Sequence, residues 1–334
     1  MLRATSAAEL VQRMHTCGAV AMSKALPTEL IRSLSVGVGD VMRPILESRK
    51  RVCRLLASAA VERANATDGD LWELHADTLA SEPIVTAYSD YQERSSGRID
   101  FGLPWQPPFN DSELVADPHV LPLLYGMMGE DVELKAVRVV YALSGAPVQQ
   151  FHRDGNDLFP EVEVEVRHQP GRHQPAYAAN VFVPLIDMDN AGAGPTEFIF
   201  GSHGHRRPIN ATINAAHATL VGTFRTAAGV SDCRVVHRGL EHTLDTPRPM
   251  LMLIYGRRWW EDNHNYEKLD YMAGRESPAF ARAIREKQCY SGDESKTLLL
   301  RRHRAADADP SERRRASFRR FVHSTFQWGG CALD

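Results

Sequence analysis

The segment Gln150-Phe151-His152-Arg153-Asp154 sets a histidine and an aspartate two residues apart. Residues i and i+2 of a strand point to the same face of a sheet, so His152 and Asp154 would project together into one interior. An imidazole nitrogen and a carboxylate oxygen are two of the three ligands of the 2-His-1-carboxylate facial triad, which leaves open positions on iron(II). The pair therefore predicts part of an iron(II) site.

The H-x-D spacing is weak evidence by itself, because the chain contains a second copy at His75 and Asp77. That copy lies in the run DLWELHADTL, whose apolar spacing is typical of a helix. Side chains two residues apart on a helix diverge by about 200°, so this pair cannot share a metal ion. We therefore reject it as a metal site.

A third ligand must come from a distant strand, and the candidate is His237 at the end of the run CRVVH. Arg248 follows eleven residues later and opens the apolar run PMLMLIYG. A turn between the two runs would let their strands lie side by side, with Arg248 deep in the interior. A buried arginine needs an anionic partner, because an unpaired buried charge is very costly. A dicarboxylate would supply one through a bidentate, charge-assisted pair.

The elements that must position these residues change character along the chain. We expect helices over residues 7–16, 27–48, 50–64 and 70–80, and loops with short helices over 84–118. We expect strands over residues 132–143, 148–152, 161–167, 179–186, 196–200, 233–237 and 249–256. Short strands separated by clusters of Gly, Pro, Asn and Asp are typical of a β-sandwich or barrel. The predicted fold is mainly β with flanking helices, around a double-stranded β-helix (jelly-roll, cupin-like) core.

The chain shows neither an internal repeat nor a flexible linker, so we expect a single domain over residues 1–334. N-terminal helices and loops would extend to about residue 130, the jelly-roll core would span about 131–260, and a helical extension would follow over 261–334.

The net charge is -3, which gives no electrostatic reason to expect nucleic acid as a partner. We see no apolar run long enough to insert in a membrane, no secretory signal and no C-terminal S-K-L, so the expected location is cytoplasmic. The five cysteines are odd in number and widely spaced, which predicts free thiols. The expected partner is a small-molecule substrate, and the oligomeric state is left open.

Three linked stretches resemble the phytanoyl-CoA dioxygenase family of 2-oxoglutarate oxygenases. They are VQQFHRD, ANVFVPLIDMDNAGAGPTEFIFGSH and VVHRGLEHTLDTPRPMLMLIYGRRWW. The shared pattern is an H-x-D, a G-P loop before a G-S-H turn, and a distal His-x-Gly with an arginine eleven residues after the histidine. The opening stretch MHTCGAVAMSKALPTELIRSL also resembles the N-terminal helix pair of the family, so the resemblance covers most of residues 7–260. The three stretches together are more specific than any one of them.

The resemblance implies an iron(II)- and 2-oxoglutarate-dependent dioxygenase that uses O2 and hydroxylates a C–H bond of a small organic or lipid-like substrate, with ascorbate as the reductant in vitro. By position, His152, Asp154 and His237 look like the catalytic metal ligands. Arg248 looks like the partner of the distal 2-oxoglutarate carboxylate. Gln149 or Gln150 looks like a second cosubstrate contact; strand alternation favours Gln150, whereas family members often have the glutamine one place earlier.

Two other histidine groups compete for a metal role. His242 follows the distal H-R-G and is an alternative ligand, but the eleven-residue spacing to Arg248 favours His237. His203 and His205 lie in the turn GSHGH, where histidines are usually structural. Asn180, which precedes VFVPL, is a residue of a strand edge or of the pocket.

Two alternatives to the oxygenase remain open. One is a catalytically silent jelly-roll that binds a ligand or partner, and the other is a cupin-type metal isomerase or lyase that does not use 2-oxoglutarate. Arg248 speaks against the isomerase, and the intact ligand set speaks against the silent barrel. Asp154 speaks against a halogenase, in which a small residue replaces the carboxylate.

Overall fold

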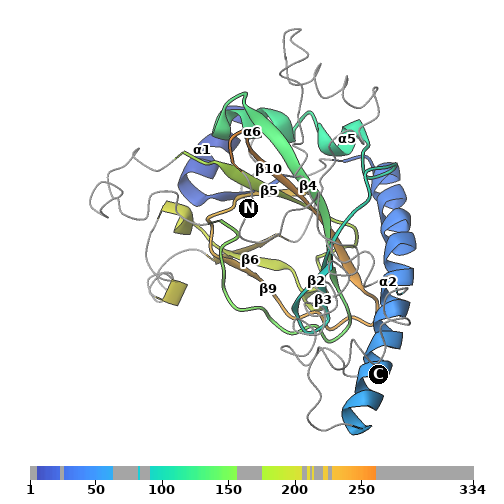
Figure 1. The fold of residues 1–334 in the computed structure, drawn as a ribbon. Coiled ribbons are helices and arrows are strands. Elements are labelled where there is room, and N and C mark those ends of the chain that lie inside the picture. Colours follow the sequence, from blue (N-terminus) through green and yellow to red (C-terminus); the bar gives the residue numbers. More distant parts are fainter. Residues whose placement is uncertain are drawn as a thin grey trace.

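The computed structural model describes residues 6–22, 26–62, 82, 91–155, 175–204, 209–210, 213, 221–224 and 228–260. Within these ranges two antiparallel sheets face each other (Figure 1). The larger has seven strands in the order β1-β8-β5-β10-β4-β3-β2, and the smaller has three in the order β7-β6-β9. This architecture confirms the predicted mainly-β jelly-roll with flanking helices.

The strands of the larger sheet are β1 (Ala19–Met22), β2 (Tyr91–Ser95), β3 (Arg98–Gly102), β4 (Val132–Ala142), β5 (Ala178–Pro184), β8 (Ala228–Asp232) and β10 (Arg248–Arg257). Those of the smaller sheet are β6 (Thr196–Ile199), β7 (Val221–Phe224) and β9 (His237–Gly239). The helices named here are α1 (Ala7–Cys17), α2 (Thr28–Glu62), α5 (Ser112–Val115), α6 (Val120–Met128) and the 3-10 turns η3 (Ala191–Ala193) and η4 (Ser202–Gly204).

The central strand β10 and its neighbour β4 are almost wholly buried, because both faces of the larger sheet are covered there. Along β10, Leu251 and Leu253 belong to the large cluster that includes residues of α2 and α6. Met250 and Met252 alternate with them and face the interior between the sheets, where they cluster with Phe198 of β6. The strand alternation therefore separates a helix-covered face from an enclosed interior.

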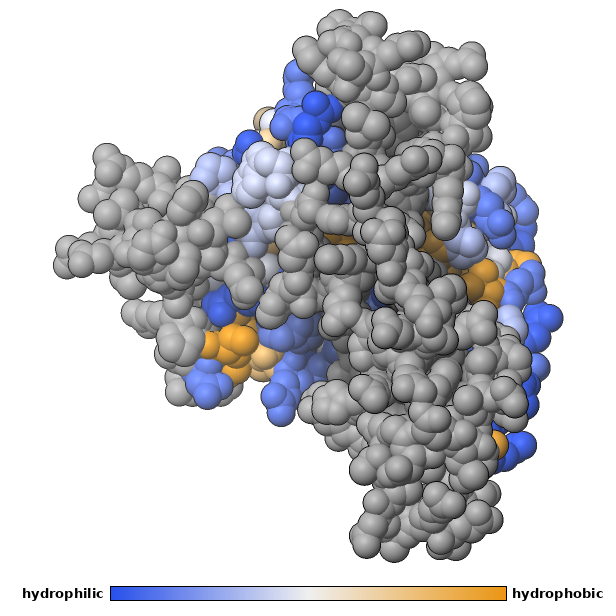
Figure 2. Space-filling model, in the orientation of Figure 1, coloured by the Kyte–Doolittle hydropathy of each residue, from blue (hydrophilic) through white to orange (hydrophobic). Residues whose placement is uncertain are grey.

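Helix α2 is one continuous helix where the sequence predicts two, over 27–48 and 50–64. Its buried residues continue at helical spacing through Leu34, Val38, Met42, Ile45 and Val52, so the apolar face does not end at the expected break. The helix runs along the larger sheet (Figure 1). Mainly hydrophilic side chains lie along its outer edge (Figure 2).

The strand predictions over 132–143, 179–186, 196–200 and 249–256 are confirmed by β4, β5, β6 and β10. The prediction of loops and short helices over 84–118 is wrong where β2 and β3 extend the larger sheet. These strands are short and mixed in composition, and their pairing is long-range: β3 pairs with β4, and β2 pairs with β3.

Several expectations fall outside the described residues: the helix over 70–80 with His75 and Asp77, the strand over 161–167, His205, and the extension over 261–334.

Cys17 and Cys233 are free thiols, as predicted. The prediction is wrong for Cys53, which is disulfide-bonded, because spacing along the chain does not decide which thiols the fold brings together. None of the described helices is both long and apolar enough to cross a membrane.

Candidate metal centre

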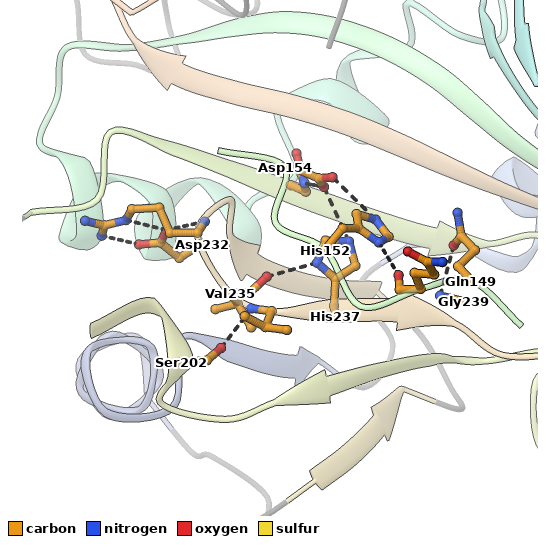
Figure 3. A network of polar contacts seen from close by, with 12 residues as sticks. Gln149, His152, Asp154, Ser202, Asp232, Val235, His237 and Gly239 are labelled. Atoms are coloured by element: carbon orange, nitrogen blue, oxygen red, sulfur yellow. Dashed lines mark hydrogen bonds and ion pairs between the residues drawn. The ribbon is translucent and has the colours of Figure 1, made fainter. Parts of the chain in front are cut away.

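Three potential metal ligands meet in the interior between the two sheets. One ligand atom from each of His152, Asp154 and His237 lies within 4.8 Å of the other two (Figure 3). The Nε2 atom of His152 lies 3.8 Å from Oδ1 of Asp154, and Nε2 of His237 lies 3.5 Å from Oδ2 of the same carboxylate. The residues predicted as ligands therefore come together within reach of a single ion.

Backbone pairing sets this arrangement. His152 and His237 form an isolated antiparallel bridge in which each N–H donates to the carbonyl oxygen of the other at 2.9 Å. The next turn of chain is held by the carbonyl of Cys233, which accepts from the N–H groups of Asp154 and Gly155 at 2.9 and 2.8 Å. Two segments that are distant in sequence are thus locked together at the ligands.

Regular strands were predicted at both of these segments, over 148–152 and over 233–237, and this is wrong. Residues 148–152 pair only through the single bridge at His152, and residues 233–235 form a turn before the short strand β9. The β-branched residues of CRVVH suit a buried position, but the turn at Cys233 is what accommodates the backbone of Asp154.

Hydrogen bonds to the backbone orient both imidazole rings. Nδ1 of His152 lies 2.9 Å from the carbonyl oxygen of Gln150, and Nδ1 of His237 lies 3.0 Å from that of Val235. A carbonyl oxygen only accepts, so each Nδ1 carries a proton, and in the neutral ring each Nε2 then has a lone pair toward the cluster. This is the tautomer that a metal ligand needs.

Two neighbouring side chains contact the ligands Asp154 and His237. Nδ2 of Asn180, a buried residue of β5, donates to Oδ2 of Asp154 at 2.6 Å. Phe198 of β6 stacks on the His237 ring at 5.5 Å between centroids and an interplanar angle of 20°. The side chain of His152 is 38% exposed and that of His237 is 7% exposed, so the cluster opens on the His152 side.

The residues of the G-S-H turn support the fold beside the cluster and are not metal ligands. Oγ of Ser202 accepts the backbone N–H of Val236 at 2.8 Å, which anchors the chain just before His237 (Figure 3). Nε2 of His203 lies 3.2 Å from the carbonyl oxygen of His15, away from the cluster.

His242 is not part of the cluster. It pairs with Ala146 as an isolated bridge, and its Nε2 lies 2.8 Å from the carbonyl oxygen of Thr246. Among the described residues, the group of possible ligands contains His237 and leaves His242 out.

Arg248 is fully buried at the start of β10, at 0% exposure. The expectation that its strand lies beside that of His237 is wrong, because β9 belongs to the smaller sheet and β10 to the larger. Arg248 faces the interior from the opposite sheet. Its Nε and Nη2 have no hydrogen-bond partner among the described residues. Burial, together with the charge of Arg98, lowers the pKa of Arg248 to about 9.

Arg98, on β3, is another buried arginine, at 1% exposure, and it was not predicted as a site residue. Burial lowers its pKa to about 10. The one signal in the sequence is the alternation in RIDFG after the turn SSG, within the range predicted as loops and short helices.

The two glutamines lie differently. Oε1 of Gln149 accepts the backbone N–H of Gly239 at 2.9 Å, two residues beyond His237 (Figure 3). The side chain of Gln150 is exposed, and only its carbonyl reaches the cluster, through His152. The preference for Gln150 assumed the alternation of a regular strand, and this segment is not one. Gln149 is the glutamine whose side chain contacts β9.

The residues present fit a divalent metal with an anionic cosubstrate. Two neutral imidazole nitrogens and one carboxylate are the donor set of the facial triad. The unpartnered N–H groups of Arg248 in the same interior fit a carboxylate.

No protein-family model matches this chain, and no curated protein matches its sequence. Solved structures are similar in fold. The non-heme alpha ketoglutarate dependent epimerase SnoN from nogalamycin biosynthesis is 17% identical with a TM-score of 0.50, covering 90% of this chain and 98% of that one. The carbocyclase SnoK from the same biosynthesis is 12% identical with a TM-score of 0.48, covering 75% and 86%. EctD from S. alaskensis, solved with 2-oxoglutarate and 5-hydroxyectoine, is 16% identical with a TM-score of 0.45, covering 82% of each chain.

Proposed function

We propose that this chain is an iron(II)- and 2-oxoglutarate-dependent dioxygenase of the phytanoyl-CoA dioxygenase type, folded as one domain. The observation that carries the proposal is the His152, Asp154 and His237 cluster with Arg248 in the same interior, where Nε and Nη2 of Arg248 have no hydrogen-bond partner among the described residues. A metal site alone would suit many jelly-roll proteins. A buried guanidinium that has no carboxylate partner among the described residues favours an anionic ligand in addition.

His152, Asp154 and His237 would hold iron(II), and Arg248 would bind the distal carboxylate of 2-oxoglutarate. Bound iron(II) supplies the coupled oxidation of 2-oxoglutarate and of a substrate C–H bond by dioxygen. The protein contributes orientation: Asn180 fixes one oxygen of Asp154, and the Nδ1–H bonds aim both Nε2 atoms inward. The enclosed sheet interior excludes water from Arg248.

The substrate is a small organic or lipid-like molecule that approaches from the exposed side of His152. Hydroxylation is the first candidate outcome. Epimerisation is the second, because SnoN, which shares the fold, is named as an epimerase. Both change a C–H bond of the substrate, but hydroxylation adds an oxygen atom and epimerisation does not, so analysis of the product separates them once a substrate is found.

The test is succinate formation from 2-oxoglutarate by purified protein with iron(II), O2 and ascorbate. Wild type is compared with His152→Ala and Arg248→Ala, and with Arg257→Met as a matched control. Arg257 lies at the other end of β10, where its Nε donates to the carbonyl of Ala176 at 3.0 Å. We expect turnover in wild type and the control, and none in the other two variants.

The alternatives predict a different result. A silent jelly-roll, or an isomerase or lyase that does not use 2-oxoglutarate, would give no succinate. It would also show no 2-oxoglutarate binding by anaerobic calorimetry with iron(II). That pair of negative results would rule out the oxygenase.

A further inference from the structure

Arg98 and Arg248 lie on either side of one small residue. In the larger sheet, β4 runs between β3 and β10, and Ala142 of β4 is directly opposite both Arg98 and Arg248. Side chains directly opposite each other in a sheet share a face. The two guanidinium groups therefore rise from the same face, separated by the methyl group of Ala142.

The guanidinium of Arg98 is only partly satisfied. Its Nη2 donates to the carbonyl oxygens of Leu240 and Pro147 at 2.8 and 3.2 Å. Its Nε and Nη1, like the Nε and Nη2 of Arg248, have no partner among the described residues. Unsatisfied buried N–H groups on two neighbouring cations are costly, so the arrangement fits an anion that both can contact.

The acidic residue nearest in sequence on the same face of β3 does not meet this need. Asp100 lies two residues along the strand, and its Oδ1 accepts from Nε of Arg138 at 2.6 Å. Arg138 is fully buried, and this ion pair compensates its charge. The contrast between Arg138, which has a carboxylate, and the pair Arg98 and Arg248 marks the latter as a ligand site.

Arg98 also lies against β9, the strand that begins at His237. A Cβ atom at Gly239 would be 2.8 Å from Nη1 of Arg98 and 2.7 Å from Oε1 of Gln149. Gly239 is two residues beyond His237 on β9. The free edge of the Arg98 guanidinium thus lies against the strand that carries a metal ligand.

We propose that Arg98 is a second cosubstrate-binding residue, which shares the distal carboxylate of the 2-oxo acid with Arg248 across Ala142. This inference rests on the proposed function and extends it to cosubstrate selection. A carboxylate has two oxygens and about four lone-pair sites, so it can accept from two guanidinium groups at once. The paired arginines select a 2-oxo acid with a distal carboxylate over one without.

The experiment compares two 2-oxo acids that differ in that group: 2-oxoglutarate, and 2-oxobutanoate, which lacks the distal carboxylate. Their dissociation constants are measured by anaerobic calorimetry with iron(II), for wild type, Arg98→Met, Arg98→Gln and Arg98→Lys. Arg257→Met is again the matched control. Melting temperatures without ligand, and the iron(II) affinity, report whether each variant folds and keeps the metal cluster.

We expect Arg98→Met and Arg98→Gln to weaken 2-oxoglutarate by about 10- to 100-fold, the range for a charge-assisted hydrogen bond. Binding of 2-oxobutanoate should change less than about threefold, and Arg98→Lys should recover part of the loss because it keeps the charge. A residue that only held the loops at Pro147 and Leu240 would weaken both acids equally, and the amide of glutamine would rescue it.

Equal weakening of the two acids, or no effect on either, would overturn the role of Arg98 while leaving the oxygenase intact. Wild type that binds neither acid would overturn the proposed function, and the inference with it. Selective loss of 2-oxoglutarate binding in Arg98→Met, with unchanged iron(II) affinity, supports the inference.

Discussion

His152 and His237 are paired through their own backbones: each N–H donates to the carbonyl oxygen of the other at 2.9 Å. Their rings lie 4.4 Å apart between centroids at an angle of 52°, with both Nε2 atoms near Asp154. The bridge ties the ligand pair to the strand that follows, so the metal geometry depends on backbone pairing as well as on side chains. Residues that support this pairing are therefore expected to affect metal affinity.

Asn180→Leu should weaken iron(II) binding by about 10- to 100-fold, because such outer partners orient metal ligands and Asp154 would lose the donor at 2.6 Å. Ser231→Ala is the control, since Ser231 is opposite Asn180 and its Oγ has no partner among the described residues. Calorimetric titration with iron(II) under anaerobic conditions measures both. Equal affinities in the two variants would contradict an orienting role for Asn180.

Arg248→Met should raise the unfolding free energy of the ligand-free protein by roughly 1–3 kcal/mol, because it removes a buried charge whose Nε and Nη2 have no partner among the described residues. The same variant should lose 2-oxoglutarate binding. Differential scanning calorimetry with and without 2-oxoglutarate separates the two effects. A lower melting temperature without ligand would mean that Arg248 serves the fold rather than the cosubstrate.

Asp232 and Arg234 form a buried pair, with Nη2 of Arg234 at 2.6 Å from Oδ2 of Asp232. Burial alone would raise the pKa of Asp232, but the charge and hydrogen bonds of Arg234 outweigh it and hold this pKa below its usual value. A carboxyl group with a depressed folded pKa stabilises the protein above its unfolded pKa of about 4 and loses that contribution as pH falls through the folded value.

The melting temperature of wild type should therefore fall steeply below about pH 4. Arg234→Met should cost about 3–5 kcal/mol at neutral pH, because it leaves the Asp232 charge buried and unpaired. Replacing both residues by leucine should recover most of that loss in stability. It should also make the melting temperature fall less steeply below about pH 4. Identical pH profiles for wild type and the double variant would show that this pair contributes nothing to acid sensitivity.

Gly155→Ala should lower both stability and iron(II) affinity, because a Cβ there would overlap Sγ of Cys233 and Oη of Tyr177. Relief requires the turn at Asp154 to move, at a cost of about 1–3 kcal/mol. Gly39→Ala is the matched control, since no atom lies within 4 Å of its added Cβ and alanine favours the helix α2 by about 1 kcal/mol. Unchanged metal affinity in Gly155→Ala would contradict the tight fit.

The sequence alone determined the parts whose signal is local. The β-rich run at 132–143 and the apolar run at 249–256 predicted strands, and β4 and β10 lie there. Residue type and spacing singled out His152, Asp154, His237 and Arg248, and the fold brings the first three together. The jelly-roll core followed from the succession of short strands.

Only the tertiary structure decided which strands pair and which side chains meet. Arg98 could not be found because its significance comes from the shared register with Ala142 and Arg248, across strands far apart in sequence. The same holds for the contact of Asn180 with Asp154 and for the placement of β9 and β10 in opposite sheets. Strand order and register depend on the packing of the whole sheet, whereas the local sequence carries mainly the tendency to be extended.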